Sequence, residues 1–139
     1  MSDEQATSDP EQAGPRPYFQ FVDDPTQFRD PGALVVRVPR KARGKEKLLG
    51  TLAVPLKFPK YFGWNWDALD EVLGDLTWLK PVRRVVIVHE GLPFSPREPQ
   101  LKTYLSCLVD AQTMRRAKPD ELQLEVVFPA AAREAVTNA

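Results

Sequence analysis

Three apolar runs, separated by stretches with helical spacing, dominate the pattern along this chain. Residues 33–38 and 85–88 are apolar throughout apart from Arg37, as in strands that are buried on both faces of a parallel sheet. Residues 122–127 alternate leucine with polar side chains before two valines and predict a third strand. The helices predicted between these strands span residues 44–53, 66–76 and 98–117. This order predicts an α/β fold with a small three-stranded parallel sheet packed by helices.

The chain before residue 33 divides into two parts. Residues 1–17 hold three prolines and, after Met1, no aliphatic side chain larger than alanine. They have too little apolar surface to offset the entropy of ordering, so we predict a disordered tail over 1–17 and a single domain over 18–139. Residues 18–22 are apolar apart from Gln20 and precede a turn signal. They fit either a short strand or a hydrophobic anchor laid on the domain.

Composition argues against several classes of function. The chain has 139 residues, with 19 basic and 19 acidic side chains, so no overall field draws it to nucleic acid or to a membrane surface. One cysteine, Cys107, and one histidine, His89, provide neither a disulfide nor a zinc site of the usual kind. The sequence also shows no signal peptide and no apolar run of membrane length. We therefore expect a cytoplasmic protein without metal or cofactor, which is a monomer when free.

The second predicted helix has two different faces. Stepping 100° per residue gathers its apolar side chains on one side, which we expect to pack on the sheet. The other side carries Asp67, Asp70 and Glu71, with Gly74 as a bare patch beside them. Asn65 is a good N-cap, and a carboxylate in the first turn suits the helix dipole.

Two interpretations of this helix and the preceding loop are open. The ordinary one is a solvated acidic face, with Trp64 and Trp66 as loop anchors for the core. It leaves unexplained why the adjacent acids have no lysine four residues on. It also leaves Gly74 unexplained, since glycine costs about 1 kcal/mol against alanine inside a helix. The other interpretation is a binding surface, because aromatic side chains on loops beside charge often mark one, and the residues alone favour it slightly.

Residues 58–78 carry a specific pattern of aromatic, glycine, asparagine and acidic positions at fixed offsets. The residues that make up this pattern are Pro59, Tyr61, Phe62, Gly63, Asn65, Asp67, Ala68, Leu69 and Leu73. The pattern closely resembles the signature of the barstar family, the intracellular inhibitors of secreted ribonucleases. The resemblance implies a three-stranded parallel sheet with helices around it, in the element order predicted above.

The resemblance also implies a function for the acids. Barstar-type inhibitors present this loop and helix to the active site of a ribonuclease, where their carboxylates occupy the phosphate pocket. By resemblance, Tyr61 and Gly63 belong to the contact loop, and Asn65 and Asp67 open the contact helix. Glu71 stands where the family's principal phosphate-mimicking aspartate stands.

The chain departs from the family pattern at two of these positions. Glu71 is one methylene longer than the family's aspartate, and Asp70 replaces a tryptophan of the best-known member's interface. Asp110, on the third predicted helix, aligns with a second contact acid. The predicted partner is a secreted ribonuclease, and we expect a bacterial inhibitor and not an enzyme. The full predicted partner-binding surface is Tyr61, Gly63, Trp64, Asn65, Trp66, Asp67, Asp70, Glu71, Gly74 and Asp110.

Two alternatives keep the fold and change the partner. The first is a protein-binding module whose partner is not a nuclease. The second is nucleic-acid binding through residues 37–47, which carry six basic side chains and one acidic one. No aromatics interleave there for base stacking, so a solvated loop and helix turn is the favoured interpretation. His89 and Cys107 lack any catalytic motif around them, so we interpret both as packing residues.

Overall fold

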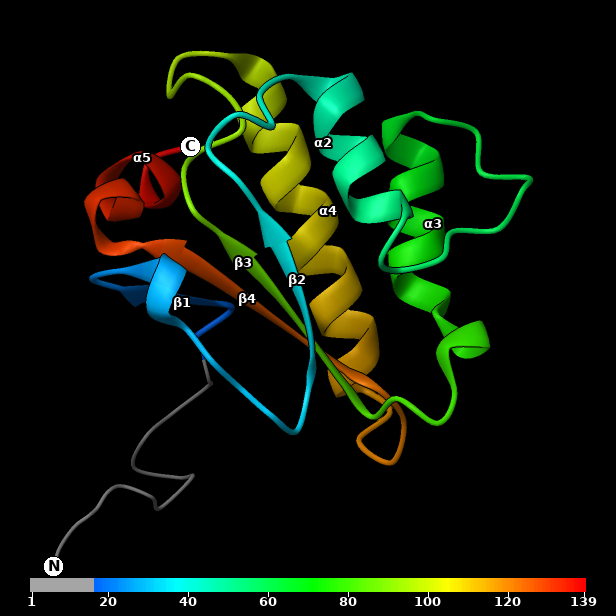
Figure 1. Ribbon diagram of the computed structural model, residues 1–139. Coiled ribbons are helices and arrows are strands. Elements are labelled where there is room, and N and C mark those ends of the chain that lie inside the picture. Colours follow the sequence, from blue (N-terminus) through cyan, green and yellow to red (C-terminus); the bar gives the residue numbers. More distant parts are fainter. Residues whose placement is uncertain (1–16) are drawn as a thin grey trace, which may run out of the picture.

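The computed structural model describes residues 17–139 and shows an α/β fold built on four parallel strands (Figure 1). The strands are β1 (Phe19–Val22), β2 (Leu34–Val38), β3 (Arg84–His89) and β4 (Gln123–Pro129). The helices are α2 (Lys45–Ala53), α3 (Trp66–Asp75), α4 (Pro99–Arg116) and α5 (Arg133–Thr137). Short 3-10 turns lie at Pro25–Gln27 (η1), Thr77–Leu79 (η2) and Ala130–Ala132 (η3). The tail predicted over 1–17 lies outside the described residues, apart from Pro17.

The sheet has four strands in the order β1–β4–β3–β2, which corrects the predicted three-stranded sheet. The additional strand is β1, whose segment the sequence left as a strand or an anchor. β1 pairs in parallel with the edge of β4, with Phe19 opposite Val126. The rings of Phe19 and Phe21 lie 5.4 and 6.4 Å from that of Phe128. The segment is therefore both a strand and an apolar anchor.

The three long helices share one face of the sheet. Their apolar side chains form one core with Val36 and Val38 of β2, Ile87 of β3 and Phe128 of β4. Alternate residues of the strands, such as Val86, face the other way, as the two-residue period of a strand requires. That second face is covered by the segment that connects β1 to β2, which contains η1 (Figure 1). The continuously apolar strands of the sequence are thus buried on both faces.

Packing against α4 and a hydrogen bond just beyond its end hold α3, the helix predicted to carry the acids, in place. It packs beside α4, the longest helix, and it follows a long connection from α2 (Figure 1). Just beyond α3, the indole Nε1 of Trp78 donates a hydrogen bond of 2.9 Å to the Leu56 carbonyl, which ties the segment after α3 to the start of that connection. The predicted helices agree with α2, α3 and α4 to within one residue at each end.

Candidate functional site

The N-terminus of α3 is capped as the sequence predicts. The Asn65 side-chain oxygen accepts a hydrogen bond of 2.7 Å from the Ala68 backbone N–H, which satisfies one of the free donors of the first turn. Leu69 and Leu73 are fully buried, so the apolar face points to the core. The opposite face therefore points outward, and Asp67 is exposed in the first turn.

Four carboxylates gather on the outer surface of α3 and α4. Asp67 and Glu71 of α3 are exposed, Asp70 is half-buried, and Asp110 of α4 is exposed beside them. The structure therefore brings Asp110 to the acids of α3, although forty residues separate it from Asp70. We call these four residues the acidic face.

Asp70 is the most constrained member of the acidic face. Its Oδ1 atom is buried and has no hydrogen-bond partner among the described residues. Burial raises the pKa of this carboxyl above its usual value, and the charge of Asp110, a hydrogen bond with the Asp110 side chain and the charge of Asp67 raise it further. Each cause disfavours the ionised form of Asp70.

No basic side chain neutralises the acidic face within residues 17–139. The ion pairs of this part of the chain lie elsewhere, and they join Arg37 to Glu90, Arg84 to Asp30 and Glu125, and Arg115 to Glu121. Native surfaces usually intersperse the two signs of charge. The acidic face is therefore a local negative patch on a chain with no net charge.

The loop before α3 presents two exposed rings. Tyr61 is 71% exposed and Trp64 is 54% exposed, whereas Phe62 between them is buried. The Phe62 ring packs between those of Phe58 and Trp64, with centroids 4.8 and 5.1 Å away. Phe62 thus holds the loop to the core, while its two neighbours face outward.

The backbone of this loop turns at Trp64. Trp64 has a φ of 56°, in the left-handed region that favours glycine. Its neighbour Gly63 is exposed, and a Cβ there would lie 3.4 Å from the Asn65 side-chain nitrogen. A bulky residue in a strained conformation, exposed beside charge, is typical of functional loops.

Trp66 lies on the core side of the helix and is not an outward ring. It is half-buried, and its indole packs 5.9 Å from the Phe94 ring and 6.2 Å from the Tyr104 ring. This position is the first residue of α3, two places beyond Trp64, and the helix turns it inward. The ordinary interpretation of a loop tryptophan as a core anchor therefore holds for Trp66, whereas Trp64 remains a surface ring.

Gly74 corrects the predicted bare patch. It is buried, because Met114 of α4 covers it, and a Cβ at Gly74 would lie 3.0 Å from the Met114 sulfur. The glycine therefore permits the close approach of α3 and α4. Met114 itself is 49% exposed. It extends the candidate site beside Asp110, one helical turn away.

His89 is a buried structural residue. Its Nδ1 lies 2.9 Å from the Val127 carbonyl oxygen, and its Nε2 lies 2.6 Å from the Tyr104 hydroxyl. The imidazole also stacks on Phe128 at 4.1 Å. Burial lowers the pKa of His89 to about 4 and raises that of Tyr104, so both are neutral near pH 7.

Cys107 is likewise a packing residue. It is buried on α4, and its Sγ lies 3.6 Å from the Trp66 carbonyl oxygen. Burial, together with the charges of Asp70, Asp110 and Asp67, raises the pKa of this thiol to about 12. Cys107 is therefore a protonated thiol near pH 7, which makes it a poor nucleophile.

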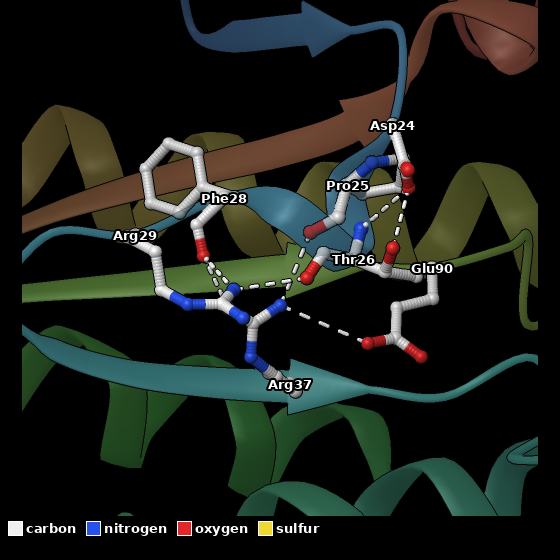
Figure 2. Close-up of polar contacts among 7 residues, drawn as sticks. All are labelled: Asp24, Pro25, Thr26, Phe28, Arg29, Arg37 and Glu90. Atoms are coloured by element: carbon white, nitrogen blue, oxygen red, sulfur yellow. Dashed lines mark hydrogen bonds and ion pairs between the residues drawn. The ribbon is translucent and has the colours of Figure 1, made fainter.

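The basic segment 37–47 does not form one continuous patch. Figure 2 shows Arg37 donating hydrogen bonds to the carbonyl oxygens of Pro25 and Phe28, with the Glu90 carboxylate 3.7 Å away. Arg37 lies on the sheet face that η1 covers, so it is separated from the exposed Arg40, Lys41, Arg43 and Lys47. This arrangement weakens the case for a phosphate-binding stripe.

The fold and the acidic face together define a small α/β protein with an exposed, uncompensated acidic helix. A family model described as Barstar (barnase inhibitor) matches residues 34–127, from β2 to within β4. The chain belongs to the barstar family, which confirms the resemblance drawn from its central motif. Neither the curated proteins nor the solved structures that were searched gave a match.

The matched region accounts for three of the four strands. It contains β2, β3 and most of β4 with α2, α3 and α4, while β1 and α5 lie outside it. In the described part of the chain, no helix is long and apolar enough to cross a membrane. Residues 17–139 also hold no group of three or more histidine, cysteine or acidic side chains arranged to bind a metal ion.

Proposed function

We propose that this protein inhibits a secreted ribonuclease by placing the acidic face and the rings of Tyr61 and Trp64 over its active site. Membership of the barstar family supports the class of function. The surface itself supports the mode of action. Exposed rings lie on the loop before α3, and carboxylates without a basic partner among the described residues lie on α3 itself and on α4.

The observation that carries the proposal is the uncompensated charge at Asp70. The fold buries one oxygen of this carboxyl without a partner and sets it against a second acid. Burying a charge without a partner is costly, and a domain of this size has a small margin of stability. A basic partner surface removes this cost, because arginine and lysine side chains supply both the charge and the missing hydrogen bonds.

A ribonuclease active site has the chemistry that this surface requires. It must bind RNA phosphates, so it presents basic groups in a concave site. Carboxylates on α3 match those groups in charge and accept hydrogen bonds as phosphate oxygens do. The local negative patch also steers the protein toward a basic cleft, an effect that weakens with salt. The exposed rings then cover apolar surface beside the charged contacts.

The test is inhibition of RNA cleavage. Each member of a panel of small secreted microbial ribonucleases is titrated with the protein. We expect at least one to be inhibited, with a break near one equivalent. Asp67→Asn combined with Glu71→Gln removes two exposed charges and should abolish this inhibition, while Glu134→Gln on α5 should retain it.

The other outcomes distinguish the alternatives. Inhibition by the double variant equal to that of the wild type would contradict the assigned surface. Failure to inhibit every ribonuclease of the panel would favour a barstar-type module with a non-nuclease partner. Direct RNA binding that falls steeply with salt and depends on Arg40 and Lys41 would favour the basic segment instead.

A further inference from the structure

A cleft of about 570 Å³ lies at the opposite end of α3 from the Asn65 cap. It forms where the end of α3, the end of α4 and the segments leading into β3 and β4 meet. Leu76, Val82 and Leu122 give it an apolar wall. The volume falls within the range of about 300–1,000 Å³ that is typical of small-molecule sites. The acidic face does not contribute to it.

Arg115 is a buried cation in the wall of this cleft. Its side chain is 3% exposed, and its Nε is buried without a hydrogen-bond partner among the described residues. Its ion pair within residues 17–139 is with Glu121, at 3.4 Å from the Nη1 atom. Charge-assisted hydrogen bonds of this kind are usually about 2.7–2.9 Å long. The guanidinium is therefore incompletely paired, a costly arrangement for a buried charge.

Glu121 is a replaceable partner for Arg115. Its side chain is 51% exposed, so its carboxylate is free to turn to water when another anion takes its place. The remaining charges of the lining are Lys80 and Arg83 against Asp120, and with Arg115 and Glu121 they leave one net positive charge. This balance favours an anion over a cation of the same shape.

The geometry points to a binding site for a small organic carboxylate with an apolar body. The ligand carboxylate replaces that of Glu121 at the Arg115 guanidinium, whose planar fork matches two carboxylate oxygens. The apolar body then packs against Leu76, Val82 and Leu122. This site is separate from the proposed ribonuclease-binding surface, and neither depends on the other.

The experiment uses benzoate as the probe, with neutral benzamide and cationic benzylammonium as matched controls. Each is titrated into the full chain while backbone amide signals are followed by two-dimensional NMR. We expect benzoate to give saturable shifts at Thr77, Val82 and Leu122, with benzamide and benzylammonium at least about tenfold weaker. Equal binding of the three probes, or no saturable shift at these residues, would overturn the assignment.

Two variants of opposite effect complete the test. Glu121→Gln removes the internal competitor and should tighten benzoate binding several-fold, while Arg115→Met should abolish it and keep most of the apolar stem. Glu134→Gln, on α5, is the control and should leave the affinity unchanged. Weaker binding of benzoate by Glu121→Gln would contradict the proposal that the ligand carboxylate replaces that of Glu121. Because Glu121 is half-exposed, Glu121→Gln should fold. It therefore tests the proposed site even if Arg115→Met does not fold.

Discussion

The carboxyl groups of Asp70 on α3 and Asp110 on α4 lie close together, and after burial the charge of Asp110 is the largest cause that raises the pKa of Asp70. Two acids held together in this way cannot both ionise without repulsion, and the burial of Asp70 adds to the cost. The contact lies between the two helices that Gly74 and Met114 bring into close approach. The same packing that stabilises the domain therefore concentrates negative charge at its surface. In our account, binding of a basic partner relieves this charge.

The first prediction concerns Asp70→Asn. Because the folded pKa of Asp70 is raised above the ordinary value of 3.8, the folded state holds more protons than the unfolded state between these two pKa values. Stability therefore falls as pH rises through that window and stays lower above it. At pH 7 the variant should gain on the order of 0.5 kcal/mol, the size of a like-charge repulsion. Urea unfolding at pH 7 measures this gain.

The matched control for Asp70→Asn is Glu71→Gln, which removes an exposed charge from the next position. It should change the free energy of unfolding by less than about 0.5 kcal/mol. A clear loss of stability in Asp70→Asn would show that the ionised carboxylate is favourable in the fold, contrary to this account.

The second prediction concerns acid unfolding through His89. Burial lowers the folded pKa to about 4 against 6.5 for the free side chain, so the unfolded state binds more protons between these values. Stability contributed by neutral His89 is complete above about pH 6.5 and is lost as pH falls to about 4, a change of about 3 kcal/mol. Urea unfolding across this range measures the slope.

The variant His89→Gln tests whether this slope belongs to His89. It should be less stable at pH 7, because the Tyr104 hydroxyl and Phe128 ring lose their partner, but the slope between pH 6.5 and 4 should be much smaller. If the variant keeps the wild-type dependence of stability on pH, that dependence belongs to groups other than His89. Measuring both proteins in the Asp70→Asn background removes the opposing contribution of Asp70.

The third prediction concerns the ring of Trp64. Because its φ is 56°, glycine adopts this backbone without strain, and Trp64→Gly removes the ring while keeping the turn. The variant should inhibit the target ribonuclease roughly tenfold or more weakly, with its unfolding free energy within about 1 kcal/mol of the wild type. Val54→Ala, at a position that is 79% exposed, is the control and should retain inhibition. Undiminished inhibition by Trp64→Gly would remove this ring from the contact surface.

The fourth prediction concerns the two helical glycines. Alanine at Gly50 in α2 meets nothing within 4 Å, so it should stabilise the domain by about 1 kcal/mol. Alanine at Gly74 meets the Met114 sulfur at 3.0 Å, so part of that gain is lost in displacing a half-exposed, flexible side chain. Adding Met114→Ala to Gly74→Ala removes the side chain that must be displaced, so it should reduce this loss of stability. Thermal unfolding is measured for the wild type, Gly50→Ala, Gly74→Ala and the Gly74→Ala, Met114→Ala double variant. Equal gains in stability from alanine at the two glycines would contradict the close approach of α3 and α4.

The elements that the sequence predicted well are those set by local patterns. The spacing of apolar side chains located the helices, and the Asn65 cap located the start of α3. The pairing of β1 with β4 was not predictable in the same way. It joins residues more than one hundred positions apart, and an apolar pentapeptide is compatible with either a strand or an anchor.

The site was predicted less completely, for a physical reason. Trp64 and Trp66 lie on either side of Asn65 in the sequence, but one has a left-handed backbone and the other begins a helix, so their rings face opposite ways. Met114 follows the apolar spacing of α4, yet it reaches past the core to cover Gly74. The position of Met114 depends on how α3 meets α4, which no local pattern encodes. Asp110 was placed beside α3 by family resemblance alone.

Competition at the ribonuclease active site tests the central claim most directly. The affinity of the protein for its target ribonuclease is measured by calorimetry at rising concentrations of a mononucleotide that occupies the phosphate pocket. If the acidic face takes that pocket, the apparent Kd must rise in proportion to the mononucleotide concentration once this exceeds the nucleotide's own Kd. An unchanged Kd, with protein and nucleotide bound together to the enzyme, would contradict the account.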